Sequence, residues 1–303
     1  MARSPGSGDG KSPAFYFCSF HALTGNGLDI CPFRADTSAR VRKAPTARRV
    51  AMDALVDTGA SASEVRQARH ELAAAFRLGA LHGWEDQLAA HFSCRLADGT
   101  FLLNPLGLMF DEITASSLMR VDMDGNVLDQ SSQVLNPAAF TIHSAVYAAR
   151  PDLRSVMHLH TPDGAAVSAL AEGLLPLNQN AMIIHADIAY HDFEGIAQDL
   201  DERDRLSRDL GGHNMMILRN HGTLAAGGTI GTVFYRLYFL EWACTTQVRT
   251  LGMGRTLRMP GAGAQATVTR QSAEGVFVPE VADDLYWAAM LRRAERLFPD
   301  LDD

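Results

Sequence analysis

The sequence predicts an α/β fold built on a mixed, largely antiparallel sheet. Segments with helical periodicity alternate with short apolar runs along the chain, and tight Gly-containing turns join several of these runs. No internal repeat is visible, and 47% of the 303 residues are apolar against 20% that are charged. This composition is typical of a globular protein with enough apolar material for a sizeable core.

The helices are predicted from capping signals and from apolar residues at helical spacing. Ser61 and Glu64 have the spacing of a capping box, and apolar positions continue one helical face to about Leu81. Between Val233 and Leu251, apolar residues recur at steps of three and four, which predicts a long helix with a buried face. The predicted helices cover residues 61–81, 138–150, 201–211, 232–251 and 283–298.

The strands are predicted from apolar runs that end at turn residues. Asp98-Gly99 and Asp124-Gly125 each separate two alternating runs, which predicts two hairpins. The runs LRSVMHLHT and NMMILRNHG are short and apolar, as buried strands are. The predicted β segments cover 91–105, 118–128, 153–161 and 214–222, and residues 252–268 are predicted to be a loop rich in Gly and Pro.

The first 60 residues differ in composition from the rest of the chain. MARSPGSGDGKSP is rich in Gly, Ser and Pro, and RADTSARVRKAPTARR carries six basic residues against one acidic residue. We interpret residues 1–60 as a flexible basic N-terminal extension, because the short apolar patch within them is followed by no small-residue cleavage site. Residues 61–258 then form the main domain, and 259–303 form a C-terminal loop and amphipathic helix that we expect to pack on a neighbouring subunit.

Charge and cysteine content narrow the function classes. The formal net charge of −8 gives no reason to expect binding to nucleic acid or to an anionic membrane. No run of 18 apolar residues is present, so no membrane span is predicted. Four scattered cysteines without a C-x-x-C pair indicate free thiols in a reducing, cytoplasmic compartment; they are Cys18, Cys31, Cys94 and Cys244.

Histidines at two strand ends form a candidate metal site. His158 and His160 are two residues apart on a predicted strand, so they point to the same face, and His221 ends the run NMMILRNHG. Imidazole nitrogen is a suitable ligand for zinc, iron, manganese or cobalt, which need three or four ligands at about 2.0–2.2 Å. The spacing alone leaves an alternative, in which these histidines only form hydrogen bonds at the edge of a sheet.

Four sequence blocks, in order, resemble the class II aldolase/adducin family, and most closely its bacterial adducin-like branch. They are FLLNPLGLMFDEITASSLMRVDMDG, IHSAVYAARPDLRSVMHLHTPDGAAVSAL, IAYHDFEG and ILRNHGTLAAGGTI, within a similarity that spans about 65–251. The resemblance implies a three-layer α/β/α sandwich with one divalent transition metal per subunit. The implied ligands are His158, His160 and His221, with zinc as the first choice and iron, manganese or cobalt as alternatives.

The chain departs from the family's sugar-phosphate aldolases at the positions that bind phosphate and move the proton. The glutamate position is Ala139, the Gly-Asn pair is replaced by Ala90-His91, and the Thr-Gly pair by Leu106-Gly107. An alanine cannot act as a general base, and apolar side chains cannot replace the hydration of a phosphate dianion. We therefore expect an unphosphorylated substrate.

Other residues of the matched blocks are candidates for the substrate pocket. Tyr190 matches the family tyrosine that donates a proton in a neighbouring subunit's site, and its alternative role is a packed strand aromatic. His143 is expected to line the pocket or to orient a ligand, which is a supporting role. His185 and His191 flank Tyr190 and are candidate pocket residues or ordinary polar residues. His91, Ala139 and Gly107 complete the predicted pocket.

Three functions from different classes fit these residues. The first is a metal-dependent lyase that cleaves a C–C bond of an unphosphorylated oxo acid or aromatic acid, by decarboxylation or retro-aldol reaction. The second is a non-haem iron oxygenase acting on an aromatic 2-oxo or 2-hydroxy acid, although three histidines without a carboxylate depart from the commonest iron triad. The third is a non-catalytic interaction module like the adducin head domain.

The predicted assembly is a homotetramer with active sites at the subunit interfaces. The helix over 232–251 carries aromatic residues beyond its core-facing stripe, so most of its circumference is apolar. The alternative is that this helix and the C-terminal helix cover each other within one chain. The family resemblance implies a four-fold ring, in which Tyr190 acts in trans. Beyond a small-molecule substrate, we expect no nucleic-acid or membrane partner.

Overall fold

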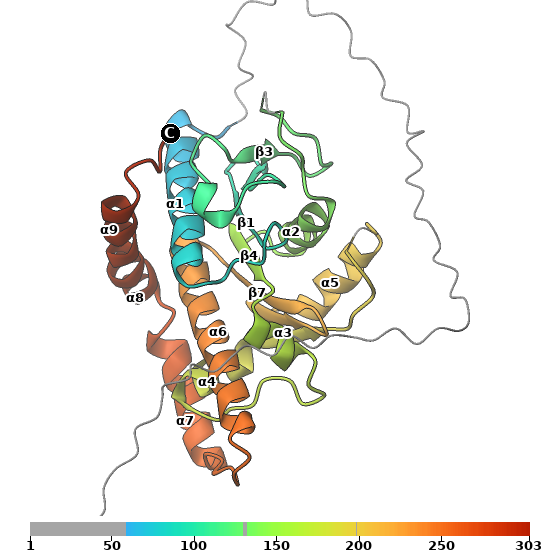
Figure 1. Ribbon diagram of the computed structural model, residues 1–303, viewed down its shortest axis with the longest axis vertical. Coiled ribbons are helices and arrows are strands. Elements are labelled where there is room, and N and C mark those ends of the chain that lie inside the picture. Colours follow the sequence, from blue (N-terminus) through green and yellow to red (C-terminus); the bar gives the residue numbers. More distant parts are fainter. Residues whose placement is uncertain (1–58, 130–131, 198) are drawn as a thin grey trace, which may run out of the picture. The chain divides into compact units, whose positions relative to one another are not determined.

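A mixed seven-stranded sheet forms the centre of the computed structural model, which describes residues 59–129, 132–197 and 199–303 (Figure 1). The strand order is β3-β2-β1-β4-β7-β6-β5. All neighbouring pairs are antiparallel except the parallel pair β5–β6, which confirms the predicted sheet type. The strands are β1 (His91–Arg95), β2 (Phe101–Leu103), β3 (Met119–Val121), β4 (Ser155–Leu159), β5 (Ile188–His191), β6 (Met215–Leu218) and β7 (Gly222–Gly227).

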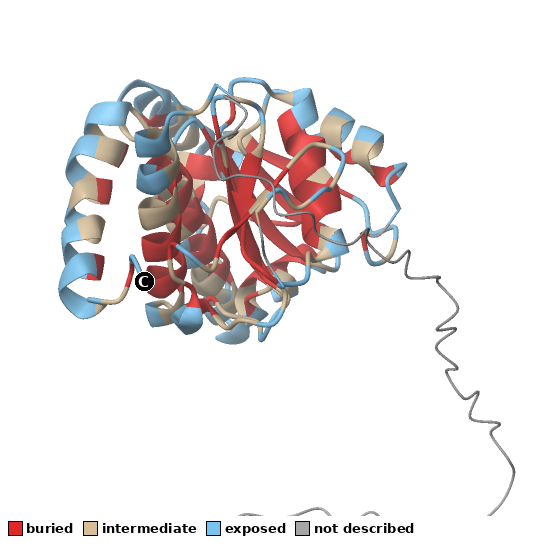
Figure 2. Cartoon of the chain, turned by 90° about the horizontal axis from the view of Figure 1, so that it is seen from above, coloured by how far each residue is buried: buried red, intermediate tan, exposed pale blue. Residues whose placement is uncertain are grey.

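Helices cover both faces of this sheet and give the predicted three layers. Helices α2 and α5 pack on each other over one face, and α1, α3 and α6 cover the other. Figure 2 shows the buried sheet between these two helical layers. The helices are α1 (Ala62–Leu81), α2 (Pro137–Ala149), α3 (Pro162–Ser168), α4 (Gln179–Ile184), α5 (Glu202–Leu210), α6 (Ile230–Gly252), α7 (Ala262–Gly275), α8 (Pro279–Val281) and α9 (Ala288–Leu297).

The start of α1 uses half of the predicted capping box. Ser61 Oγ accepts a hydrogen bond from the Glu64 amide at 3.1 Å, as expected of an N-cap serine. The Glu64 carboxylate instead accepts from the Ala97 amide at 3.0 Å and from Arg154 Nη2 at 2.5 Å. Glu64 therefore ties the helix to the β1–β2 turn and to the entry of β4.

Several predicted elements need correction. The predicted loop over 252–268 is wrong in its second half, because α7 begins at Ala262 after the N-cap Gly261. The predicted strand over 214–222 is too long, because β6 ends at Leu218 and a tight turn then leads to β7, of which only Gly222 falls in the predicted range. The segment Gly222–Gly227 was missed because its small residues lack the apolar alternation of a strand. The second hairpin is reduced to β3 and a single bridge between Val121 and Val127.

The C-terminal segment packs against α1, α4 and α6 of its own chain. A π-helical stretch, Ala282–Trp287, precedes α9 and seats Trp287 on α6, where a Cβ on Gly231 would come within 2.5 Å of Trp287 Cβ. Tyr286 lies against Tyr235, with ring centroids 4.3 Å apart. This arrangement matches the alternative in which the two apolar helices cover each other. The packing of 259–303 on a neighbouring subunit stays a prediction.

Two expectations from the sequence concern residues that the structure describes only in part. The basic extension, with Cys18 and Cys31, falls almost wholly within residues 1–58 and so lies outside them. Cys94 and Cys244 are described, and both are buried free thiols. Among the helices described, none has the length and apolar character needed to cross a membrane.

Candidate metal centre

Three imidazoles meet where β4 ends and β7 begins. His158 lies in β4, His160 follows that strand directly, and His221 precedes β7. The two strands pair so that His158 faces Leu224 across the ladder. His221 therefore lies in the β6–β7 turn, beside β4, rather than at the end of the predicted strand. We call His158, His160 and His221 the histidine cluster.

The turn that presents His221 depends on two backbone features. Asn220 adopts a positive φ of 55°, a left-handed conformation that asparagine tolerates better than most residues. At Gly222, an added Cβ would lie 2.2 Å from the Leu159 carbonyl oxygen. Only glycine lets the two backbones approach so closely. The glycine after His221 is thus required for the imidazoles to meet.

The three Nε2 atoms converge on one point. They lie 2.7 Å apart between His158 and His160, 2.8 Å between His160 and His221, and 3.2 Å between His158 and His221. Tetrahedral coordination at about 2.05 Å places ligand nitrogens about 3.3 Å apart. The cluster is slightly tighter than that spacing and needs only a small expansion to hold one ion.

Hydrogen bonds at the opposite ring nitrogens fix which atoms carry lone pairs. His158 Nδ1 donates to the Thr223 carbonyl at 2.8 Å, and His160 Nδ1 donates to the Asp86 carboxylate at 3.1 Å. With Nδ1 as the donor, each of these two rings turns the lone pair of its Nε2 toward the other imidazoles. Lone pairs at this distance repel one another, and a shared cation removes the repulsion.

The electrostatics of the cluster disfavour a shared proton. Burial, followed by the charges of the neighbouring histidines, lowers the pKa of His158 well below its usual range. The same two causes lower the pKa of His221 to about 4. At neutral pH both rings are neutral, so a metal ion fits this donor set and a proton does not.

A buried carboxylate supports the backbone around the cluster from behind the sheet. Glu241 of α6 accepts short hydrogen bonds from the hydroxyl groups of Thr161 and Thr223. Thr161 follows His160, and Thr223 supplies the carbonyl that orients His158. Burial raises the pKa of Glu241. Glu241 therefore ties the end of β4 to the start of β7.

An apolar cavity of about 520 Å³ opens beside the cluster. His160 and His221 form part of its wall, together with His91 from β1. No lysine or arginine lines it among the described residues. The remaining lining residues are Gln87, Leu88, Ala89, Leu106, Asn136, Ala138, Ile142, Phe193, Gly195, Ile196 and Ala197. We call this space the histidine cavity.

A chain of hydrogen bonds leads from the cavity wall into the core. His91 Nδ1 and His143 Nε2 are 2.7 Å apart, and His143 Nδ1 forms a short hydrogen bond with Ser93 Oγ. Ser93 Oγ lies 2.6 Å from the Tyr147 hydroxyl. Burial lowers the pKa of His143 to about 3, so its ring is neutral. The chain holds the His91 ring in place and leaves Nε2 of His91 without a partner among the described residues.

The predicted pocket residues divide into three groups. His91 lines the cavity, and His143 supports it from inside the core. Ala139 is buried next to the lining residue Ala138, whereas Gly107 is exposed and lies outside the lining, to which its neighbour Leu106 belongs. His185 is exposed in a short 3₁₀ helix away from the cavity, and His191 is buried with its Nδ1 2.7 Å from Asp209.

Tyr190 is held within its own chain, away from the cluster. Its hydroxyl accepts a hydrogen bond from the Leu174 amide at 3.1 Å, and the Arg219 guanidinium lies 4.2 Å from the ring centroid. Tyr190 packs with the core under α1 and α6, whereas His158 points to the α2 face. These contacts match the packed strand aromatic. The role of Tyr190 in a neighbouring site stays a prediction.

Three functional side chains were missed from the sequence. Asp86 orients His160 across 74 residues of chain, and Phe193 and Ile142 form apolar walls of the cavity. Nothing in the sequence around Asp86, which lies in the loop after α1, indicates that it orients a histidine. Phe193 could have been singled out, because it stands in the matched block IAYHDFEG.

Comparisons with known proteins agree with this geometry. Residues 70–248 match the model of the class II aldolase and adducin N-terminal domain. An aldolase class 2 protein of Caulobacter vibrioides, whose name leaves its activity provisional, is 48% identical over 78% of this chain and 92% of its own length. Mouse alpha-adducin is 45% identical over 60% of this chain, which corresponds to only 25% of the adducin.

A solved structure shares the fold. The crystal structure of an aldolase II superfamily protein from Pseudomonas syringae superposes with a TM-score of 0.75 and 44% sequence identity. The match covers 80% of this chain and 97% of the other. The family model spans more than half of the chain, and its region contains all three histidines of the cluster. This chain belongs to the class II aldolase and adducin N-terminal domain family.

Proposed function

We propose that the protein is a metal-dependent lyase that cleaves a C–C bond of an unphosphorylated oxo acid or aromatic acid. The observation that carries this proposal is the position of three converging Nε2 atoms at the wall of an apolar cavity. A phosphate dianion would find no lysine or arginine among the described residues of that wall. An acid with an apolar body would instead contact Leu88, Ile142 and Phe193.

His158, His160 and His221 are the proposed ligands of one divalent ion, with zinc as the first choice. Bound there, such an ion supplies Lewis acidity toward a carbonyl or carboxylate oxygen. Asp86 holds the His160 ring in the orientation for binding. The apolar walls exclude water from the bound acid, and His91 Nε2 is the chain's own group for a hydrogen bond to it.

The reaction favoured within this class is decarboxylation. Ala139 is buried behind the cavity wall and offers no carboxylate for proton abstraction. Decarboxylation starts with the departure of carbon dioxide and needs no base for that step, whereas retro-aldol cleavage does. The proton that the product takes up would come from solvent, because the lowered pKa values of His91 and His143 leave both rings neutral.

The working unit is proposed to be a homotetramer with each cavity completed by a neighbouring subunit. Three large apolar side chains lie exposed in the segment that borders the cavity: Phe193 at 54%, Ile196 at 75% and Leu200 at 55%. Large apolar side chains that lie exposed close to one another in the sequence are a common feature of interfaces. If Tyr190 acts in trans, mixing His158→Ala and Tyr190→Phe subunits restores part of the activity.

The sequence identity with alpha-adducin favours a second candidate function, a non-catalytic interaction module. An interaction module needs the fold but not the metal, so it would not depend on three converging imidazoles. Metal analysis of protein purified without added metal separates the candidates. One equivalent of zinc, manganese or cobalt with carbon dioxide release from unphosphorylated 3-oxo acids supports the lyase. Iron with oxygen consumption supports the oxygenase, and absence of metal supports the module.

The decisive variant is His221→Ala, with His185→Ala as its control. Both replace a histidine, but His185 is exposed and outside the cluster. His221→Ala should lose both metal and carbon dioxide release, while His185→Ala should keep them. Equal metal content in the two variants would contradict the proposed site.

A further inference from the structure

A second cavity, of about 370 Å³, lies where α4, α6 and α7 meet. Its lining residues are Ile183, Ala186, Asp187, Asn214, Arg236, Thr269, Ser272, Ala273, Phe277 and Val278. None of them lines the histidine cavity. We call this space the arginine cavity, because Arg236 is the only lysine or arginine in its lining among the described residues.

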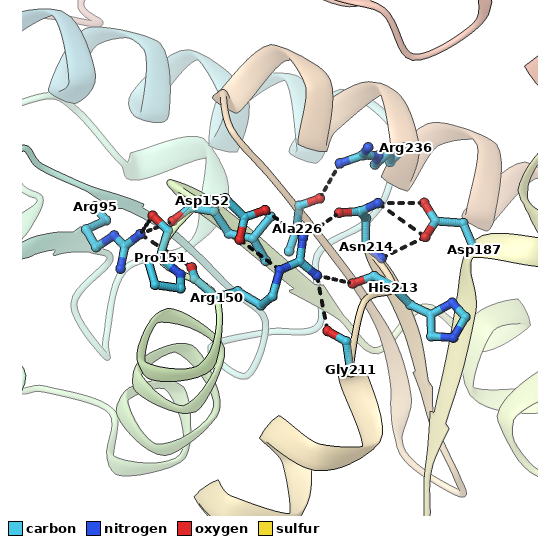
Figure 3. Close-up of polar contacts among 11 residues, drawn as sticks. Arg95, Arg150, Pro151, Asp152, Asp187, Gly211, His213, Asn214, Ala226 and Arg236 are labelled. Carbon is cyan, nitrogen blue, oxygen red and sulfur yellow. Dashed lines mark hydrogen bonds and ion pairs between the residues drawn. The ribbon is translucent and has the colours of Figure 1, made fainter. Parts of the chain in front are cut away.

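The Arg236 guanidinium has few partners. Nη1 donates to the Ala226 carbonyl at 2.7 Å (Figure 3). The guanidinium carbon lies 5.5 Å from the Phe277 ring centroid. Nε is buried and has no hydrogen-bond partner. Within the described ranges, Arg236 forms no ion pair. Its burial lowers the pKa of the group, yet a guanidinium stays charged at any ordinary pH.

The nearest acids are already engaged. Both Asp187 oxygens accept from the Asn214 side-chain amide, at 2.9 and 3.2 Å, and one also accepts from the Asn214 backbone amide at 2.9 Å (Figure 3). Asp283, the other acid that raises the Arg236 pKa, accepts hydrogen bonds from the hydroxyl groups of Thr229 and Thr232. Asp187 is close enough to raise the Arg236 pKa, but it does not neutralise the guanidinium by contact.

A half-buried guanidinium with a buried, unpartnered Nε and no contacting counter-ion is unfavourable, and an anion in the adjoining space offsets that cost. The charges around the cavity indicate the net charge of its ligand. One guanidinium attracts one negative charge, and the negative charge of Asp187 repels a second. The cavity wall favours a ligand with an apolar body, because Ile183, Phe277 and Val278 offer apolar surface. A planar carboxylate also matches the paired N–H geometry of a guanidinium better than a spherical anion does.

We propose that the arginine cavity binds a small organic monocarboxylate, with its carboxylate on Arg236 and its apolar body against Phe277. This site is separate from the proposed lyase centre. It stands whether or not that centre has the proposed activity.

The test uses benzoate and butyrate as probes on the full chain, at constant ionic strength balanced with chloride. Thermal unfolding and calorimetric titration should show saturable binding of one equivalent, with a dissociation constant on the order of 1 mM. Inorganic phosphate should bind at least several-fold more weakly. Arg236→Met should abolish the saturable response, while Arg205→Met, which removes an exposed arginine of α5, should leave it unchanged.

Each outcome decides the proposal. Arg236→Met in chloride should be at least as stable as the wild type, because it removes an unpaired buried charge. If it fails to fold, Arg236→Lys replaces it and should weaken benzoate binding about tenfold, because lysine lacks the paired N–H geometry. A response that survives in both variants but is lost in His221→Ala places the acid at the histidine cluster and overturns the proposal. So does a wild type without saturable binding.

Discussion

The histidine cavity and the arginine cavity are both partly apolar, yet they present opposite polar groups. The first offers lone pairs from three converging imidazoles, and the second offers a guanidinium that donates to one backbone carbonyl. Neutral donors that converge attract a cation, and a cation without a counter-ion attracts an anion. The comparison shows that groups left unpaired within the fold indicate the charge of the missing ligand.

The largest effect should come from removing one imidazole. His221→Ala leaves two ligands and one lone-pair repulsion, so stoichiometric metal binding should be lost, as measured by metal analysis after dialysis. Benzoate binding at the arginine cavity should be unchanged in the same variant. Loss of both would show that the two cavities are coupled and would break the comparison.

Gly222→Ala should be the next largest change. Its Cβ would meet the Leu159 carbonyl at 2.2 Å, so β7 must move away from β4 and carry His221 with it. We expect a loss of roughly 2–4 kcal/mol in unfolding free energy, measured by denaturant titration, together with a large loss of metal affinity. Gly212→Ala is the matched control, because a Cβ there has open space. Similar behaviour of the two variants would contradict the close-approach argument.

Removing the charge at Asp86 should weaken metal binding without abolishing it. Asp86→Asn keeps a hydrogen-bond acceptor for His160 Nδ1 but loses the carboxylate that makes the ring more basic. The metal dissociation constant should rise about 10- to 100-fold in a competition titration. Asp111→Asn, an exposed acid, should have no effect. An unchanged constant for Asp86→Asn would remove Asp86 from the site.

The stability of the metal-free protein should fall as the pH is lowered from about 6.5 to 4. The pKa of His221 falls from 6.5 to about 4 on folding, so between these values the unfolded chain binds more protons than the folded chain. The stabilisation is therefore complete above pH 6.5 and is lost as the pH falls through 4. Denaturant titrations along this range should show a shallower slope in His221→Asn. An equal slope would show that His221 is not protected in the fold.

The smallest effect should come from removing the negative charge beside Arg236 in the arginine cavity. Asp187→Asn removes the negative charge that opposes an anion while keeping an acceptor for the Asn214 amide. Benzoate should bind about two- to fivefold more tightly, because the opposing charge is near Arg236 but not in contact with it. Asp209→Asn, which borders a different part of the sheet, serves as the control. Weaker binding in Asp187→Asn would sink the monoanion argument.

Local sequence patterns were enough to predict the long helices and the shared face of His158 and His160, but not β7 or α7. A strand alternates its faces at every residue, so His158 and His160 had to share one face, and helical periodicity fixed α1, α2 and α6 to within a few residues. These are local properties, which spacing along the chain encodes. The ordered blocks added His221, whose role no local pattern shows.

The surroundings of those residues are set by the tertiary fold. The pairing of β7 with β4, the approach of Asp86 to His160, and the lone Arg236 beside Phe277 all join positions far apart in the chain. The small residues of β7 and the Gly-rich start of α7 carry weak local preferences, so packing determined their structure. Whether a polar side chain is paired depends on every neighbour the fold brings to it, and spacing along the sequence does not record those neighbours.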